Sequence, residues 1–88
     1  MSSNQQKSEG QIMKELIQYI SEALVDRPEE VKVNVVEGEN SIILELKVAA
    51  DDVGKVIGKG GQTAKALRKI LSAAATKLRK KALLQIVE

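Results

Sequence analysis

A glycine-rich turn with a lysine inside it, Gly58–Gly61, is the part of this sequence best suited to contact a ligand. It follows a short apolar stretch that ends in Val56 and Ile57, and a long basic segment begins at Gln62. Glycine has no Cβ and adopts positive φ at low cost, so another backbone can approach it closely. Lys59 places a cation at the tip. We therefore expect a tight turn between two helices that contacts a sugar-phosphate chain.

The distribution of charge along the chain also indicates a polyanionic ligand. Residues 1–52 contain five basic and 11 acidic side chains, whereas residues 53–87 contain nine basic side chains and no acidic one. The formal net charge of only +2 conceals this asymmetry. Exposed helix faces usually combine glutamate with lysine in i,i+4 pairs. Because no such pairs are present here, we interpret the basic half as a binding surface rather than as an ordinary solvated helix.

The composition excludes several kinds of chemistry. The 88 residues contain no cysteine and no histidine, which removes disulfides, thiolate metal sites and the commonest general base. We therefore expect a single small domain with no enzymatic activity, no cofactor and no metal. No apolar run is long enough to span a membrane, and the N-terminus lacks the pattern of a signal peptide. These absences favour a cytoplasmic protein that does not bind membranes.

The first half of the chain predicts a helix followed by a β-hairpin. Ser8 and Gln11 have the spacing of a capping box, and Pro28 disfavours continuation of the helix. Apolar alternation over residues 31–35 and 42–48 predicts two antiparallel strands around a turn at residues 37–40. The expected apolar face of the helix consists of Ile12, Met13, Leu16, Ile17, Ile20, Ala23 and Leu24.

Tyr19 is the only aromatic residue, and we interpret it as a packing residue beside the apolar face of the first helix. Many single-strand binding proteins stack bases on aromatic rings. A nucleic acid bound here would instead need aliphatic contacts, backbone hydrogen bonds and charge.

The second half predicts a short helix over residues 53–57, a long helix from Gln62 and a final strand over residues 82–87. Asp51 or Asp52 is expected to cap the short helix, and Gly58 to stop it. The fold class is therefore α+β, in the order α-β-β-α-α-β, with a three-stranded sheet and helices packed on one face. The expected apolar face of the long helix consists of Ala64, Leu67, Ile70, Leu71, Ala74 and Leu78.

Two phosphate-binding motifs do not fit the glycine-rich turn. In a P-loop counted from Gly54, Lys59 occupies the place of the second glycine. In a dinucleotide fingerprint, Thr63 occupies the place of the third glycine, and a helix precedes the turn instead of a strand. The remaining alternatives are a clamp on a nucleic-acid backbone and a plain turn between helices. The internal lysine and the basic helix that follows favour the clamp.

The turn and the element order together resemble a type II, or prokaryotic, KH domain. The segment from Asp52 to Arg68 is most similar to the small bacterial single-KH proteins called KhpA. This resemblance divides the chain into a flexible N-terminal tail, residues 1–10, and a KH domain, residues 11–88. It implies a cytoplasmic RNA-binding protein that acts on transcripts or small RNAs, as an RNA chaperone or post-transcriptional regulator. It also implies a homodimer, or a heterodimer with a larger KH protein called KhpB or Jag.

The predicted RNA site extends from the short helix into the long one. The turn is expected to lie against about four nucleotides, with Lys55 and Lys59 on phosphates and with Val56 and Ile57 in contact with bases. Basic residues of the long helix extend the positive field. The complete predicted site is Lys55, Val56, Ile57, Gly58, Lys59, Gly60, Gly61, Gln62, Lys65, Arg68 and Lys69.

One such clamp is expected to bind weakly, because base stacking on aromatic rings contributes about 1–3 kcal/mol per base where it is present. Function would then need two clamps, supplied by a second copy or by a second KH protein. Two alternatives remain open at this point. Beside a single-stranded RNA-binding module, the first alternative is a dimerising scaffold with reduced RNA binding, and the second is an assembly factor on ribosomal RNA.

Overall fold

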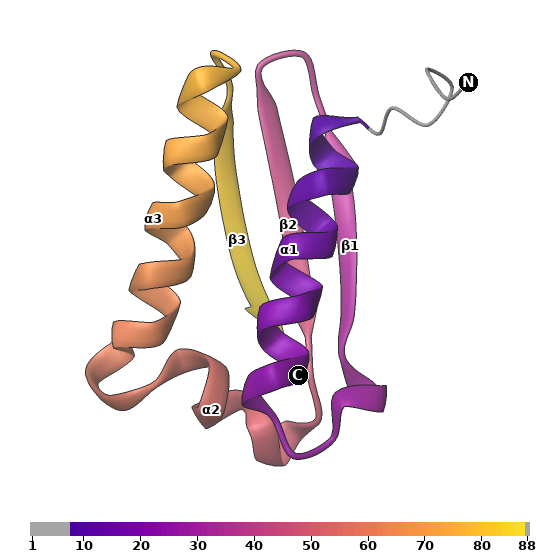
Figure 1. The fold of residues 1–88 in the computed structure, drawn as a ribbon, viewed down its shortest axis with the longest axis vertical. Helices are drawn as coiled ribbons and strands as arrows, with labels where there is room; N and C mark the ends of the chain where they lie inside the picture. Colours follow the sequence, from indigo (N-terminus) through magenta and orange to yellow (C-terminus); the bar gives the residue numbers. More distant parts are fainter. Residues whose placement is uncertain (1–7, 88) are drawn as a thin grey trace.

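The computed structural model describes residues 8–87, and the remaining residues of the predicted tail and Glu88 lie outside this range. The order α-β-β-α-α-β and the α+β class are confirmed (Figure 1). Helix α1 starts at Glu9, so residues 9 and 10 belong to the helix. The elements are α1 (Glu9–Leu24), η2 (Pro28–Glu30), β1 (Lys32–Glu37), β2 (Ser41–Lys47), η3 (Ala50–Asp52), α2 (Val53–Ile57), η4 (Lys59–Gly61), α3 (Gln62–Lys77) and β3 (Lys81–Val87).

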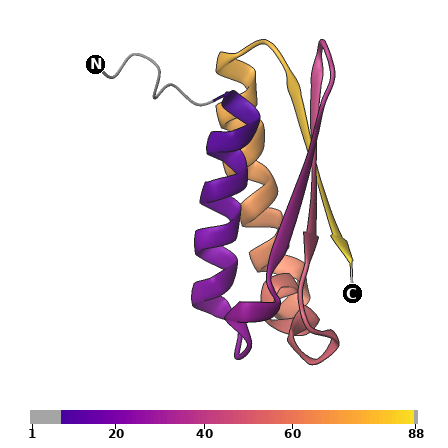
Figure 2. The same cartoon turned by 90° about the vertical axis from the view of Figure 1, so that its right-hand side faces the viewer.

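The three strands form a mixed sheet in the order β1-β2-β3. The expected hairpin is present, since β1 and β2 are antiparallel with Val35 opposite Leu44. β3 runs parallel to β2, and Leu84 pairs with Leu44. A parallel pair needs a long crossover connection, which the segment containing α2 and α3 provides. Figures 1 and 2 show α1 and α3 on one face of the sheet, as expected, with the other face uncovered.

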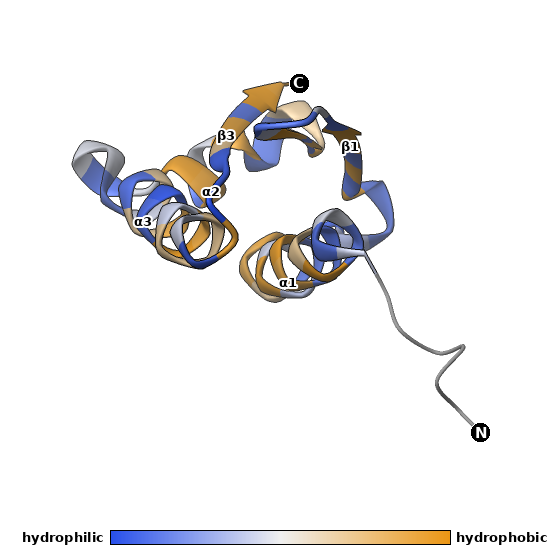
Figure 3. Ribbon diagram, turned by 90° about the horizontal axis from the view of Figure 1, so that it is seen from above, coloured by the Kyte–Doolittle hydropathy of each residue, from blue (hydrophilic) through white to orange (hydrophobic). Residues whose placement is uncertain are grey.

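The hydrophobic core lies between this sheet and the two long helices, where their apolar residues face one another (Figure 3). The central strand contributes alternate side chains that are fully buried, because it has a neighbour on each side and helices above it. The buried cluster consists of Met13, Ile17, Val31, Val33, Ile42, Leu44, Leu46, Val48, Val56, Leu67, Leu71, Ala75 and Leu84.

Only part of each predicted apolar helix face is buried. In α1 the sheet covers a stripe through Met13 and Ile17, whereas Ile12 and Leu16 remain exposed. Tyr19 is 74% exposed, so its prediction as a packing residue is wrong. Apolar residues surround more of each helix than the sheet covers, and sequence spacing alone does not show which of them face it. In α3, likewise, Ala75 is fully buried whereas Ile70 and Leu78 are exposed.

The start of α1 is held by two contacts. Ser8 caps the helix, because its Oγ accepts a hydrogen bond of 3.1 Å from the backbone N–H of Gln11. The amide side chain of Gln11 donates to Glu15 instead of completing the capping box. The backbone N–H of Gly10 donates to the Glu37 carboxylate at 2.9 Å, and a Cβ at Gly10 would overlap that side chain. Glycine therefore allows α1 to approach the end of β1 closely.

Candidate nucleic-acid interface

The Gly58–Gly61 loop is a tight turn whose backbone requires glycine. Gly58, Gly60 and Gly61 have φ values of 78°, 64° and 76°. With ψ at 169°, Gly58 lies in a region that only glycine occupies readily. Its N–H donates to the carbonyl of Gly54 at 2.9 Å, and the N–H of Gly61 donates to the carbonyl of Gly58 at 3.1 Å. The predicted turn between two helices is confirmed.

The tip of this loop is open to solvent. Lys59 and Gly60 are exposed, and no heavy atom lies within 4 Å of the position that a Cβ would occupy at Gly60 or Gly61. The loop joins α2 to α3 at the opposite end of the molecule from the turn between β1 and β2 (Figure 1). The acidic hairpin turn therefore does not cover the loop.

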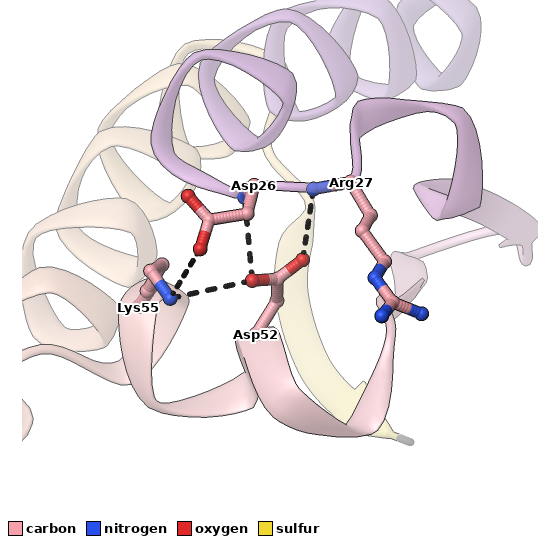
Figure 4. A network of polar contacts seen from close by, with 4 residues as sticks. All are labelled: Asp26, Arg27, Asp52 and Lys55. Atoms are coloured by element: carbon pink, nitrogen blue, oxygen red, sulfur yellow. Dashed lines mark hydrogen bonds and ion pairs between the residues drawn. The ribbon is translucent and has the colours of Figure 1, made fainter.

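A buried carboxylate anchors α2 to the segment that follows α1 (Figure 4). Asp52 is 1% exposed and accepts hydrogen bonds from the backbone N–H groups of Asp26, at 3.2 Å, and Arg27, at 3.0 Å. The ammonium of Lys55 lies 3.0 Å from the Asp26 carboxylate and 3.5 Å from that of Asp52. This network joins segments 25 or more residues apart, and it fixes the start of the short helix that carries the loop.

The network shifts the pKa values of both partners in the direction that favours the ion pair. Burial raises the pKa of Asp52, but the two backbone N–H groups and Lys55 outweigh this effect, and the pKa is lowered. The hydrogen bond to Asp26, followed by the charge of Asp26, raises the pKa of Lys55, and Asp52 contributes further. Asp52 and Lys55 are therefore both charged near neutral pH.

One prediction about this region is wrong, and another stays a prediction. The carboxylate of Asp52 makes no capping hydrogen bond to α2, because it points toward residues 26 and 27 instead. The expected pairing of Lys55 with phosphate stays a prediction, since its ammonium has two carboxylate partners but its side chain is 43% exposed. The spacing of Asp52 and Lys55, three residues apart, was the available signal for their ion pair. The location of the third partner, Asp26, was not readable from sequence because it depends on the tertiary fold.

The apolar residues before the loop divide into one that packs inward and one that faces outward. Val56 is 0% exposed, so the prediction that it contacts bases is wrong, and it anchors α2 in the core. Ile57 is 37% exposed and remains beside the loop. Gly54, which was not assigned to the site, is exposed with no heavy atom within 4 Å of its Cβ position. A glycine inside a helix costs stability, and this cost was the available signal that the surface at Gly54 is left open.

The basic residues of α3 begin at the loop and continue along the helix. Gln62 is the first residue of α3, and Gly61 before it has no side chain that could cap the helix. The first backbone N–H groups of α3, at the positive end of the helix dipole, therefore face the loop without a side-chain cap. Lys65 and Lys69 are exposed one and two turns further along. The Arg68 guanidinium donates to the carbonyl of Leu84 at 3.3 Å, which fixes this side of α3 against β3. Lys59 and these cations therefore extend from the loop along the first half of α3.

Neither a membrane-spanning helix nor a cluster of metal-ligating side chains is found among the residues that the structure describes. None of the helices in residues 8–87 has both the length and the apolar character needed to cross a bilayer. Over the same range, no three metal-ligating side chains are grouped where they could hold an ion.

Comparison with known proteins gives a consistent result. Residues 14–86 match the family model described as the KH domain of KhpA and KhpB. The RNA-binding protein KhpA of Clostridium perfringens is 57% identical over 75 residues, which cover 85% of this chain and 100% of the relative. That of Chlamydia muridarum is 51% identical over 76 residues, covering 86% and 97%. That of Borreliella burgdorferi is 50% identical over 74 residues, covering 84% and 90%.

The matched region starts within α1, includes β1, β2 and the helices on both sides of the glycine loop, and ends within β3. The relatives are named for RNA binding, and the family is not an enzyme family. Fold and sequence similarity therefore agree, and this chain belongs to the KhpA/KhpB family of KH-domain proteins.

Proposed function

We propose that this protein binds single-stranded RNA, with the backbone of the Gly58–Gly61 loop lying against about four nucleotides. The observation that carries the proposal is the open loop tip, where Gly60 and Gly61 have positive φ and no heavy atom within 4 Å of their Cβ positions, beside an exposed Lys59. RNA binding by the relatives, as their names state, supports it. Gly58 is required by the turn itself, because Thr63 occupies the space of its Cβ, whereas Gly60 and Gly61 leave space that a ligand can enter.

Binding in this mode depends on charge and backbone contact. Phosphates approach the loop, where Lys59 and the N-terminal end of the α3 dipole both attract anions. Bases then rest on the exposed surface formed by Gly54 and Ile57. Lys55 contributes indirectly, because its ion pairs with Asp26 and Asp52 hold α2 in the position that presents the loop.

The protein acts as a pair of clamps, because a single clamp without aromatic stacking binds weakly. The surface that supports pairing with a second copy is a groove of about 390 Å³ between α1 and α3. Its floor is apolar, and its rim carries Glu9 and Lys77, which have opposite charges. A two-fold contact would bring Glu9 of each chain toward Lys77 of the other. The groove is lined by Glu9, Ile12, Met13, Ala73, Ala74, Lys77 and Leu78.

A pair of variants at Gly60 tests the proposed site. Gly60→Asp and Gly60→Asn place nearly isosteric side chains in the same open space at φ 64°, so they share any backbone strain and differ in one charge. A carboxylate about 4 Å from a phosphate repels it by about 1–4 kcal/mol, depending on the local dielectric. We expect Gly60→Asp to weaken binding of a single-stranded RNA about tenfold or more, and Gly60→Asn to change it much less.

The measurement is a salt titration of RNA affinity, with melting curves to show that both variants are folded. If Gly60→Asp binds RNA as tightly as the unmodified chain, the loop is not the RNA site. Retained self-association by the same variant would then favour the dimerising scaffold.

A further inference from the structure

A second basic surface lies at the end of α3 that is farthest from the glycine loop. There the turn between α3 and β3 meets the turn between β1 and β2 (Figure 1). The two turns enclose a hollow of about 490 Å³ with a mostly polar set of side chains. It is lined by Asn40, Ser41, Thr76, Arg79, Lys80 and Lys81.

The backbone at Arg79 is unusual for an arginine. Among residues 8–87, Arg79 is the single non-glycine residue with positive φ, at 60°. The N–H groups of Arg79 and Lys80 donate to the carbonyls of Thr76 and Ala75, both at 3.0 Å, which is the Schellman pattern that ends a helix. Glycine is the preferred residue at this position. An arginine that occupies it against that preference indicates a use for its side chain.

Among residues 8–87, no carboxylate is found in an ion pair with the cations of this hollow. The ion pairs found among the described residues belong to Lys55, at the other end of the molecule. Of the acidic residues in the nearby hairpin turn, Glu37 already accepts a hydrogen bond from Gly10, and Glu39 does not line the hollow. The three consecutive cations from Arg79 to Lys81 therefore face solvent together with the polar groups of Asn40 and Ser41.

A polar stripe on α3 connects this hollow to the loop. Successive residues of an α-helix are rotated by about 100° around its axis. With this spacing, the polar residues of the stripe fall within a sector about 100° wide that contains no apolar residue. The bond from Arg68 to Leu84 places it on the β3 side of α3, whereas the apolar groove lies on the α1 side. The 16 residues of α3 separate the two ends by about 24 Å. The stripe consists of Lys65, Arg68, Lys69, Ser72 and Thr76, and Arg79 lies just beyond the end of α3.

We propose that the hollow at the α3–β3 turn is a second phosphate-binding site, which holds the backbone of the same RNA strand that occupies the glycine loop. This inference rests on the proposed function. A stacked strand that advances about 3.4 Å per nucleotide crosses the intervening 24 Å in about seven nucleotides. An RNA of about five nucleotides therefore reaches the loop alone, and one of about 12 nucleotides reaches both sites.

The experiment compares a 5-nucleotide and a 12-nucleotide single-stranded RNA on two double variants with equal loss of charge. Arg79→Asn with Lys81→Gln removes two cations from the hollow, and asparagine tolerates positive φ. As the control, Lys32→Gln with Lys47→Gln removes two exposed cations that lie opposite each other on β1 and β2. Melting curves establish that both variants are folded.

We expect the hollow variant to bind the 12-nucleotide RNA about tenfold more weakly while keeping its affinity for the 5-nucleotide RNA. The dependence of log affinity on log salt for the longer RNA should flatten by about 1.4, since each lost phosphate contact on a single strand contributes about 0.7. The control variant should change either affinity by less than about twofold.

Unchanged affinity of the hollow variant for the longer RNA would overturn the second site. Equal weakening of both RNAs, or equal weakening by the control variant, would also overturn it, because the effect would then be one of net charge. The variant Gly60→Asp distinguishes failure of the second site from failure of the proposed function of the loop. If that variant keeps full affinity for the 5-nucleotide RNA, the loop proposal fails, whereas the second site is judged by the longer RNA alone.

Discussion

Replacement of Gly58 by alanine should destabilise the protein far more than the same change at Gly60. The backbone of Gly58, with φ 78° and ψ 169°, lies where other residues are strained. Its Cβ would lie 2.8 Å from the Cβ of Thr63 and 2.9 Å from the backbone nitrogen of Thr63. The nitrogen cannot rotate away as a side chain would, so either the loop or the start of α3 must move.

The size of the effect follows from these two terms. The backbone strain costs about 1–3 kcal/mol and the overpacking another 1–3 kcal/mol, or roughly 2–6 kcal/mol together. A domain of 88 residues has a free energy of unfolding of about 4–13 kcal/mol, so Gly58→Ala removes a large part of it. At Gly60 no atom lies within 4 Å of the Cβ position, and only the strain of positive φ remains, about 1–2 kcal/mol.

Urea denaturation followed by circular dichroism measures both losses. A double variant, Gly58→Ala with Thr63→Ala, removes the hydroxyl contact but keeps the backbone nitrogen and the unfavourable φ. It should therefore recover only part of the lost stability. Equal destabilisation by Gly58→Ala and Gly60→Ala would refute this description of the loop, because the two positions would then have equivalent surroundings.

Two further variants probe the ends of α2 and α3. Asp52→Asn should lower the free energy of unfolding at neutral pH, because the neutral amide loses the attraction of Lys55 and cannot accept both backbone N–H groups equally well. The folded-state pKa of Asp52 is lowered, so its contribution is present above its ordinary value of 3.8 and is lost as the pH falls below it. Denaturation at several pH values should show this acid-dependent loss in the unmodified chain and a smaller loss in the variant. Arg79→Gly should raise the free energy of unfolding by about 0.5–1 kcal/mol, measured by thermal melting. Glycine relieves the strain of positive φ, about 1–2 kcal/mol, and this gain exceeds the extra conformational entropy of glycine in the unfolded chain, about 0.4–1 kcal/mol. A fall in melting temperature would contradict the helix-ending geometry at this residue.

The element order and the glycine turn were predictable because both depend on local pattern. Alternating apolar residues predict the strands, and a glycine that stops one helix immediately before another predicts the loop between α2 and α3. The predicted short helix over residues 53–57 has the bounds that the structure gives it. Local signals of this kind act within a few residues and so are visible in a single sequence.

Features that depend on tertiary contact were not predictable in the same way. The burial of Val56 and the exposure of Ile57 differ although both are apolar and adjacent, because α2 turns only one side toward the core. The backbone partners of Asp52 lie 25 or 26 residues away in sequence, and no local pattern identifies them. Tyr19 faces solvent for the same reason, since the sheet covers only one stripe of α1.

The proposed RNA site is tested most directly by titrating the ¹⁵N-labelled protein with a single-stranded RNA of about four nucleotides and following every backbone amide by NMR. The open loop predicts that the largest shifts fall on the amides of residues 58–62, with smaller shifts at Gly54 and Ile57. Shifts confined to the uncovered face of the sheet, or to the groove between α1 and α3, would contradict the assignment of the loop as the RNA site.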